Sequence, residues 1–141
     1  MGEAPALRIH VFSFSYRNSG PPVDDSGHGG GFVFDCRALP NPYWEESLRP
    51  HTGREPVIAE FMERHPEVAE FAERATGLVL YAARTYRERG YERLMAAFGC
   101  TGGRHRSVYL AELLGRRLEQ EGYSVVLEHR GIGLEPERQE P

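Results

Sequence analysis

The chain has 141 residues, of which 40% are hydrophobic and 27% charged, and its formal net charge is −4. These values are typical of one globular domain that can bury a core of its own. No apolar run approaches the roughly 20 residues of a membrane-spanning helix, and the N-terminal residues lack the basic and apolar segments of a secretory signal. We therefore expect a cytoplasmic protein with no membrane partner. Because the net charge is negative, any binding of anions must come from a local cluster of basic residues.

All 17 basic residues are arginine, since the sequence contains no lysine. The absence of lysine excludes a Walker A loop and a lysine Schiff base, and with them conventional P-loop nucleotide hydrolysis and lysine-dependent pyridoxal chemistry. Each arginine is a planar fork that can bind phosphate or carboxylate through two hydrogen bonds. Cys36 and Cys100 are too few for a disulfide framework and lack the spacing of a zinc site. Residues 24–28 contain Asp and His but are more typical of a flexible glycine-rich loop, so we expect no metal and no other cofactor.

The N-terminal part of the chain is predicted to contain two strands separated by a loop. Residues 7–14 alternate between apolar and polar side chains and are rich in β-branched and aromatic residues, which predicts a strand. Residues 18–31 are rich in Gly, Pro, Ser and Asp and predict a loop. Residues 32–34 predict a short buried strand that ends at Asp35. Two prolines within residues 39–44 argue against regular structure there.

The rest of the chain is predicted to alternate helices with strands. Pro56 and Pro66 each begin a helix, because a proline at the first helical position costs no hydrogen bond. A strand at 94–98, a helix at 107–122 and a last strand at 124–128 follow. The apolar residues predicted to face the core are Val57, Ile58, Phe61 and Met62 in the first helix, and Val68, Phe71, Ala72, Ala75, Leu78, Val79, Ala82 and Tyr86 in the second.

This order of elements predicts the fold class. A strand, a loop, a helix and a second strand in succession form a right-handed crossover between parallel strands. We therefore expect an α/β fold: a small, mostly parallel sheet with flanking helices, built around a strand, an anion-binding loop and a helix. Residues 1–130 are predicted to form a single domain. Residues 131–141 contain two prolines and four charged residues and are predicted to be a disordered tail.

The segment Gly-Cys-Thr-Gly-Gly-Arg-His-Arg-Ser, residues 99–107, lies between a predicted strand and the start of a predicted helix. Its two adjacent glycines let the backbone turn sharply and approach a ligand closely. The helix N-terminus offers unpaired N–H groups and the positive end of a dipole. Arg104, His105 and Arg106 add positive charge, and Ser107 can cap the helix or donate to an oxygen. A phosphate-sized anion is the expected occupant of this loop.

The same segment also matches the Cys-x5-Arg-Ser loop of cysteine-dependent phosphatases, in which a thiolate attacks phosphorus while Arg clamps the oxygens. The spacing is weak evidence, because a chain with so many arginines often places one six residues after a cysteine by chance. In this alternative Cys100 is the nucleophile and Asp35 is the best placed general acid. The favoured interpretation of Asp35 is that it caps or orients Arg37. We therefore expect a protein that is not an enzyme.

Basic residues follow the carboxyl end of each predicted strand, where parallel α/β sheets bind their ligands. The arginines that could share one pocket there are Arg17, Arg37, Arg104, Arg106 and Arg130. A proline-stiffened segment with Asn41, Tyr43 and Arg49 suits the recognition of sugar hydroxyls. Trp44, in the same segment, is expected in the core rather than against a ligand.

Three segments of the chain carry a resemblance to a known family. They are Phe-Asp-Cys-Arg-Ala-Leu-Pro-Asn-Pro-Tyr-Trp at 34–44, Leu-Arg-Pro-His-Thr-Gly at 48–53 and Gly-Cys-Thr-Gly-Gly-Arg-His-Arg-Ser-Val-Tyr at 99–109. In this order they resemble the C-terminal domain of the RNase adapter protein RapZ family, and the resemblance spans about residues 9–130. It implies a domain that senses glucosamine-6-phosphate and that, in some bacteria, binds small RNAs and presents them to an endoribonuclease.

The resemblance also implies a set of ligand-binding residues. The phosphate would be held by Thr101, Gly102, Gly103, Arg104, His105, Arg106 and Ser107, and the pocket would be completed by Arg37, Asn41 and Arg49. The family commonly has Val, His and Lys where this chain has Cys36, Tyr43 and Arg104. The change at Tyr43 leaves the identity of the sugar open, whereas Arg104 keeps the positive charge. The family's N-terminal Walker A domain is absent from this sequence, so ATP binding is not expected.

The sequence thus favours a non-enzymatic sensor or binding domain for a phosphorylated small metabolite. An amino sugar phosphate such as glucosamine-6-phosphate is the first choice, and the domain would act as a regulatory adapter. One alternative is a Cys100-dependent phosphatase. The other is an RNA-binding adapter, which the charge of −4 disfavours unless oligomerisation gathers the arginines. The expected partner is a phosphorylated small molecule or an inorganic anion, while RNA, a regulatory protein and a second copy of the chain stay open.

Overall fold

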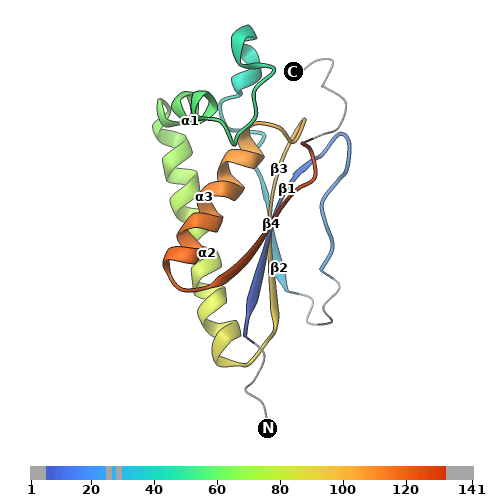
Figure 1. Ribbon diagram of the computed structural model, residues 1–141, viewed down its shortest axis with the longest axis vertical. Helices are drawn as coiled ribbons and strands as arrows, with labels where there is room; N and C mark the ends of the chain where they lie inside the picture. The colour runs from blue at the N-terminus through green and yellow to red at the C-terminus, as the bar shows by residue number, and fades with distance from the viewer. Residues whose placement is uncertain (1–5, 25–26, 28–29, 133–141) are drawn as a thin grey trace.

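The computed structural model describes residues 6–24, 27 and 30–132. The strands and α-helices in these residues are β1 Arg8–Ser15, β2 Gly31–Asp35, α1 Pro56–Glu63, α2 Pro66–Glu88, β3 Arg93–Cys100, α3 Arg106–Gln120 and β4 Ser124–His129 (Figure 1). The strands form one four-stranded sheet in the order β2-β3-β1-β4, and every neighbouring pair is parallel. The predicted α/β fold with a small parallel sheet is therefore confirmed.

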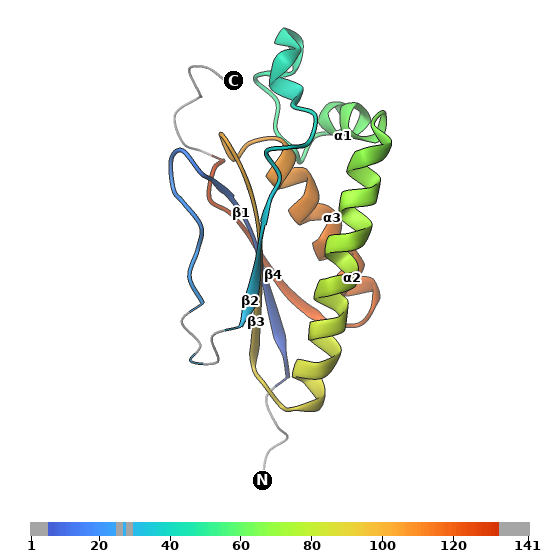
Figure 2. The same ribbon diagram turned by 180° about the vertical axis from the view of Figure 1, so that it is seen from behind.

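The described part of the chain is built in two layers. All three helices, α1, α2 and α3, lie on one side of the sheet, while residues 16–24 run along the other side (Figure 2). The sheet is therefore covered by helices on one face only.

The face that meets the helices carries the main core. Ile9 and Val11 of β1 pair in register with Leu94 and Ala96 of β3, and all four are buried to 1% exposure or less. Residues paired in a parallel sheet point to the same side, so these side chains form one apolar surface against the helices. They belong to a single buried cluster that includes residues of all three helices.

The opposite face carries a smaller cluster. Phe12 and Phe14 of β1 pack with Met95 and Ala97 of β3, and Tyr16 covers them at one end. The alternation of residues along β1 therefore buries side chains on both faces of the strand, which the position of β1 between β3 and β4 explains.

The helices begin at Pro56 and Pro66, as predicted. The residues that α2 buries are Val68, Ala72, Ala75, Val79 and Ala83, spaced three or four apart. The prediction that Leu78 faces the core is wrong, because Leu78 is 53% exposed. It precedes Val79 by one residue and is therefore turned about 100° away from the buried stripe. The prediction that Val57 of α1 faces the core is also wrong, because Val57 is 37% exposed.

The proline-rich segment differs from its prediction in one respect. Residues Pro42–Trp44 form a short 3-10 helix, followed by another at Glu46–Leu48. Pro42 occupies the first position, where its missing N–H is not needed, and the Asn41 side chain accepts a hydrogen bond from the Tyr43 amide at 3.0 Å. The prolines thus permit a single regular turn rather than excluding one.

All four strands end at the same edge of the sheet, at the top of Figure 1. The segments that follow them are residues 16–17, 36–37, 101–105 and 130–132. The two 3-10 helices lie beyond this edge, at the same end of the molecule. This edge is where the sequence placed the ligand.

The described residues bear on three further expectations: the membrane helix, the metal site and the C-terminal tail. None of the helices described is long and apolar enough to cross a membrane. Within 6–24, 27 and 30–132, no group of three or more His, Cys, Asp or Glu side chains could hold a metal ion. Asp25, Ser26 and His28 of the acidic loop lie outside the described residues, as does the predicted tail from residue 133 onward.

Candidate functional site

The loop of residues 101–105, which we call the anion loop, joins the last residue of β3, Cys100, to the first residue of α3, Arg106. Because β3 lies between β2 and β1, the anion loop emerges from the interior of the sheet edge. Its far end is the N-terminus of a 15-residue helix. The sequence placed this loop correctly, with the start of the helix one residue later than observed.

Neighbouring segments bind the anion loop through its carbonyl oxygens. The amide of Arg17 and the hydroxyl of Ser15 donate to the Thr101 carbonyl at 3.3 and 2.7 Å. The amide of Gly53 donates to the Arg104 carbonyl at 2.8 Å. The loop is therefore held between β1 and the segment that precedes α1.

The backbone N–H groups of the anion loop differ from its carbonyl oxygens in their hydrogen bonding. Among the residues described, the backbone N–H groups of Thr101, Gly102, Gly103 and Arg104 donate to no protein acceptor. A run of N–H groups that leads into a helix N-terminus is a binding surface for an anion, because donors and helix dipole act together. The backbone of the anion loop is suited to a phosphate group.

Glycine is required at the centre of the loop. Gly103 has a φ of +72°, and a Cβ atom there would lie 2.9 Å from Ser15. Gly131, just after β4, packs so closely that a Cβ on it would lie 2.3 Å from the Gly103 carbonyl oxygen. Segments from β1 and from the end of β4 therefore fix the shape of the loop from two sides.

Two of the predicted basic residues tie the loop to the segment before α1. The Arg104 guanidinium donates to the Pro50 carbonyl at 3.2 Å, and its side chain stays partly exposed. His105 is only 4% exposed, and its Nε2 donates to the His51 carbonyl at 2.7 Å. The motifs at 48–53 and 99–109 thus meet in space, although about fifty residues separate them.

Arg106, which the resemblance assigned to phosphate binding, has its side chain bound within the protein. It is 3% exposed, and its Nη1 donates to the carbonyls of Arg37 and Leu39 at 2.9 and 3.2 Å. These contacts fix the turn that follows β2. Arg106 therefore connects the base of α3 to the end of β2 through its side chain.

Asp35 and Arg37 form an exposed ion pair at the end of β2. The Arg37 Nε and Nη2 atoms donate to the Asp35 carboxylate at 2.9 and 2.7 Å, and the guanidinium lies 3.9 Å from the Tyr16 ring centre. Hydrogen bonding from Arg37 is the main reason that the pKa of Asp35 lies below its usual value. The prediction that Asp35 orients Arg37 is confirmed, and an ionised carboxylate of this kind is a poor general acid.

The proline-rich segment places the remaining predicted residues close together. Asn41 is 2% exposed and caps the first 3-10 helix through the Tyr43 amide. Arg49 donates from Nε to the Tyr43 carbonyl at 2.8 Å, and its guanidinium lies 4.6 Å from the centre of the Tyr43 ring. Trp44 is 62% exposed, so the prediction that it belongs to the core is wrong. The turn that begins at Pro42 directs this indole outward.

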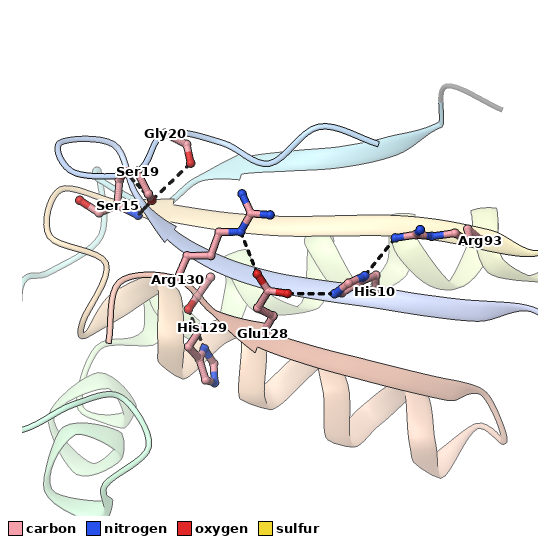
Figure 3. A network of polar contacts seen from close by, with 9 residues as sticks. His10, Ser15, Ser19, Gly20, Arg93, Glu128, His129 and Arg130 are labelled. Atoms are coloured by element: carbon pink, nitrogen blue, oxygen red, sulfur yellow. Dashed lines mark hydrogen bonds and ion pairs between the residues drawn. The ribbon is translucent and has the colours of Figure 1, made fainter. Parts of the chain in front are cut away.

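The Arg130 side chain is paired on the sheet face without helices. Arg130 donates from Nε to Glu128 at 2.9 Å and lies 4.8 Å from the Phe12 ring centre, on the sheet face without helices. Figure 3 shows the chain of polar contacts continuing from Glu128 to His10 at 3.5 Å and from His10 to Arg93 at 3.1 Å. Of the five arginines that were predicted to share one pocket, Arg130 belongs to this network.

One buried cluster was not predicted from the sequence. The Ser13 hydroxyl lies 2.6 Å from Nδ1 of His129, and Nε2 of His129 lies 2.7 Å from the Glu112 carboxylate. Ser13 is fully buried, and His129 connects its hydroxyl on β1 to Glu112 on α3. The position of His129 at a strand end was the only signal for it, since nothing in the spacing pairs it with Glu112.

Comparison with known proteins identifies the family. Residues 7–133 match the family model described as the RapZ C-terminal domain. The chain belongs to the RapZ C-terminal domain family. The expected resemblance is confirmed over the whole described domain.

The RapZ C-terminal domain of this chain is similar to several curated proteins that carry the name nucleotide-binding protein. It is 44% identical over 131 residues to one from Cereibacter sphaeroides strain KD131, covering 93% of this chain and 42% of that protein. It is 39% identical over 132 residues to one from Jannaschia sp. strain CCS1, covering 94% and 40%. It is 43% identical over 133 residues to one from Laribacter hongkongensis, covering 94% and 46%. The chain therefore spans less than half the length of these relatives.

Proposed function

We propose that this RapZ C-terminal domain binds a phosphorylated small metabolite on the anion loop and acts as a sensor or regulatory adapter rather than as an enzyme. The proposal rests on the different hydrogen bonding of the carbonyl and N–H groups within residues 101–104. Their carbonyls at Thr101 and Arg104 are bound by neighbouring segments, whereas their amides donate to no described acceptor. The name nucleotide-binding protein, which the relatives carry, also fits a ligand that contains phosphate.

The surroundings of the loop fit a sugar phosphate. Arg37 and Arg49 are exposed cations stacked on Tyr16 and Tyr43, which presents each guanidinium in a defined orientation. The Tyr43 hydroxyl and the backbone groups of the proline-rich segment would face the sugar. Asn41 fixes the conformation of that segment through its hydrogen bond with the Tyr43 amide. An amino sugar phosphate such as glucosamine-6-phosphate is the first ligand to test, as the family resemblance implies.

The phosphatase alternative finds little support in the geometry. A Cys-x5-Arg phosphatase directs its arginine at the phosphate, but the Arg106 guanidinium is buried against the carbonyls of Arg37 and Leu39. Cys100 is 2% exposed, and its Sγ contacts the Ser107 hydroxyl at 3.2 Å. These contacts favour binding over turnover.

The RNA-binding adapter is the second alternative. A chain with a formal charge of −4 attracts a polyanion weakly, so RNA binding would depend on a local group of arginines. Binding to RNA through phosphates would weaken steeply with salt, whereas binding of a small ligand to backbone amides would weaken much less. Salt titration separates the two.

The test is a thermal shift and calorimetric titration of the purified domain with four matched compounds: glucosamine-6-phosphate, glucose-6-phosphate, glucosamine and inorganic phosphate. We expect binding by the phosphorylated sugars and none by glucosamine. A ligand at 100 times its Kd stabilises the native state by about 2.7 kcal/mol, which a melting curve resolves. If no phosphorylated compound stabilises the domain at millimolar concentration, the proposal is wrong.

A further inference from the structure

The two cysteines of the chain lie opposite each other on neighbouring strands. Asp35 of β2 pairs in register with Gly99 of β3, so the next residues along the two strands are Cys36 and Cys100. The amide of Cys36 continues the ladder by donating to the Gly99 carbonyl at 2.7 Å. Two residues that lie 64 positions apart in the sequence are thus neighbours in the sheet.

Both side chains point to the same side. Cys36 and Cys100 are 0% and 2% exposed and belong to the same buried cluster on the helix-covered face. Both are reduced in this structure. The two sulfurs therefore share one buried environment at the base of the anion loop.

The spacing of parallel strands is compatible with a bond between these sulfurs. Neighbouring strands lie roughly 4.7–4.9 Å apart, and the Cα atoms of a disulfide usually lie about 4.4–6.8 Å apart. The Cβ atoms of a parallel pair stay close to the strand spacing, slightly farther apart than the roughly 3.5–4.5 Å of relaxed disulfides. Cys36 follows the last residue of β2, so a small shift of the strand end would close the difference. A bridge formed in this way is strained and therefore easily reduced, which is the property of regulatory disulfides.

The two cysteines differ in their surroundings. Burial raises the pKa of the Cys36 thiol well above its usual value, so Cys36 is a poor first nucleophile toward a peroxide. Cys100 lies next to the anion loop, where its Sγ accepts from the Ser107 amide at 3.5 Å and contacts the Ser107 hydroxyl at 3.2 Å. Cys100 is thus the sulfur closer to the ligand site, and Cys36 is the partner that can resolve its oxidised form.

We propose that Cys36 and Cys100 form a reversible disulfide when the protein meets a peroxide, and that this bond switches the anion loop between two states. The Cys100 thiol attacks one peroxide oxygen, the O–O bond breaks, and a sulfenic acid and one water form. The Cys36 thiol then gives up its proton and its sulfur attacks the Cys100 sulfur. The S–O bond breaks and the leaving hydroxide takes up that proton, so that the disulfide and a second water form. Two thiols and one hydrogen peroxide therefore give one disulfide and two waters, and an ordinary dithiol reverses the change.

A disulfide between Cys36 and Cys100 would affect the ligand site through the residues that follow each cysteine. Thr101, the first residue of the anion loop, follows Cys100, and Arg37 follows Cys36. A disulfide would also remove the Cys100 sulfur from its contacts with Ser107 in the first turn of α3. We expect weaker binding of a phosphorylated ligand by the oxidised domain. This second half of the inference rests on the proposed function, whereas the disulfide itself does not.

The first experiment detects the bond in the wild-type protein. The reduced domain is treated with hydrogen peroxide under native conditions, quenched with N-ethylmaleimide and digested with trypsin without reductant. We expect the peptides of residues 18–37 and 94–104 to appear as one linked species that a dithiol separates. Cys36→Val, which keeps an apolar side chain at this buried position, should leave Cys100 unlinked and open to further oxidation. Free Cys36 beside an oxidised Cys100 in the wild type, or a link only between two chains, would overturn the proposal.

The second experiment measures binding. Glucosamine-6-phosphate is titrated into the reduced, oxidised and re-reduced wild type, and into Cys100→Ser before and after peroxide treatment. We expect at least a tenfold loss of affinity in the oxidised wild type alone, restored by the dithiol. A linked protein with unchanged affinity overturns the switch. A linked protein whose reduced form binds no phosphorylated sugar overturns the proposed function but not the disulfide.

Discussion

The buried guanidinium of Arg106 donates to the carbonyl oxygen of Arg37 at 2.9 Å, and this contact joins the base of α3 to the end of β2 across 69 residues of sequence. A second bond from the same nitrogen reaches the Leu39 carbonyl at 3.2 Å. The anion loop and the turn that presents Arg37 are therefore parts of one framework. A change at either end of this contact should affect both.

Replacing Arg106 by alanine should destabilise the fold. The change removes two charge-assisted hydrogen bonds and leaves the carbonyls of Arg37 and Leu39 without this donor, so the free energy of unfolding should fall by roughly 2–4 kcal/mol. Arg104→Ala is the matched control, because Arg104 stays partly exposed with one hydrogen bond to Pro50, and its loss should cost less than about 1 kcal/mol. Urea denaturation measures both. Equal stability of the two variants would show that Arg106 does not hold the framework.

Gly103→Ala should destabilise the domain and weaken phosphate binding. The left-handed φ of +72° and the Ser15 contact leave no room for a methyl group, so we expect a loss of about 1–3 kcal/mol. Gly77→Ala is the control: Gly77 lies within α2 with nothing within 4 Å of its added Cβ, and alanine there should stabilise by up to about 1 kcal/mol. Thermal denaturation should move the two melting temperatures in opposite directions. A stabilising effect at Gly103 would contradict the loop geometry.

The sequence predicted those features that depend on local signals. The alternation in β1, the prolines at the starts of α1 and α2, and the glycines of the anion loop each act through neighbouring residues, and each element was found where it was predicted. The exposures of Leu78 and Trp44 were predicted wrongly, because the side that an apolar residue faces depends on the layer packed against it.

The roles of the site residues were harder to predict. The partners of Arg106 at Arg37 and Leu39 were not predicted, because they are set by the pairing of β2 with β3, which no local pattern reveals. The contact of Ser13 with His129 depends in the same way on the pairing of β1 with β4.

The pair of Ser13 and His129 should act as one energetic unit. Ser13→Ala leaves His129 Nδ1 without its hydroxyl partner, and His129→Ala removes contacts to both Ser13 and Glu112. In a double-mutant cycle the combined loss should be smaller than the sum of the single losses by about 0.5–1.5 kcal/mol. Chemical denaturation of the four proteins gives this coupling. Additive losses would mean that the hydrogen bond contributes nothing to stability.

Stability should decrease as the pH falls below about 6.5, in part because of His10. Burial is the main cause that lowers the pKa of His10 below its ordinary value of 6.5, with Arg93 adding to the effect and Glu128 opposing it. The unfolded chain therefore takes up a proton at higher pH than the folded domain, and the equilibrium shifts toward unfolding between pH 6.5 and the lowered pKa. His10→Gln should flatten this part of the stability curve, measured by urea denaturation at pH 7.5, 6.5 and 5.5. An unchanged slope would show that His10 does not contribute.

The choice between a sensor and a phosphatase can be made by measuring turnover. In a cysteine phosphatase the sulfur forms a covalent bond to phosphorus, so Cys100→Ser would abolish catalysis. In a sensor the sulfur packs beside the ligand, and under reducing conditions Cys100→Ser should leave the affinity for a phosphorylated sugar within about tenfold, or roughly 1.4 kcal/mol.

We expect the wild type to release no phosphate in multiple turnovers from glucosamine-6-phosphate or from an aryl phosphate, because Arg106 is engaged with backbone carbonyls and Asp35 is held ionised by Arg37. Reactivity of the thiol toward an alkylating reagent does not decide the question, because alkylation does not measure the release of phosphate. Steady phosphate release by the wild type that is lost in Cys100→Ser would establish the enzyme instead of the sensor.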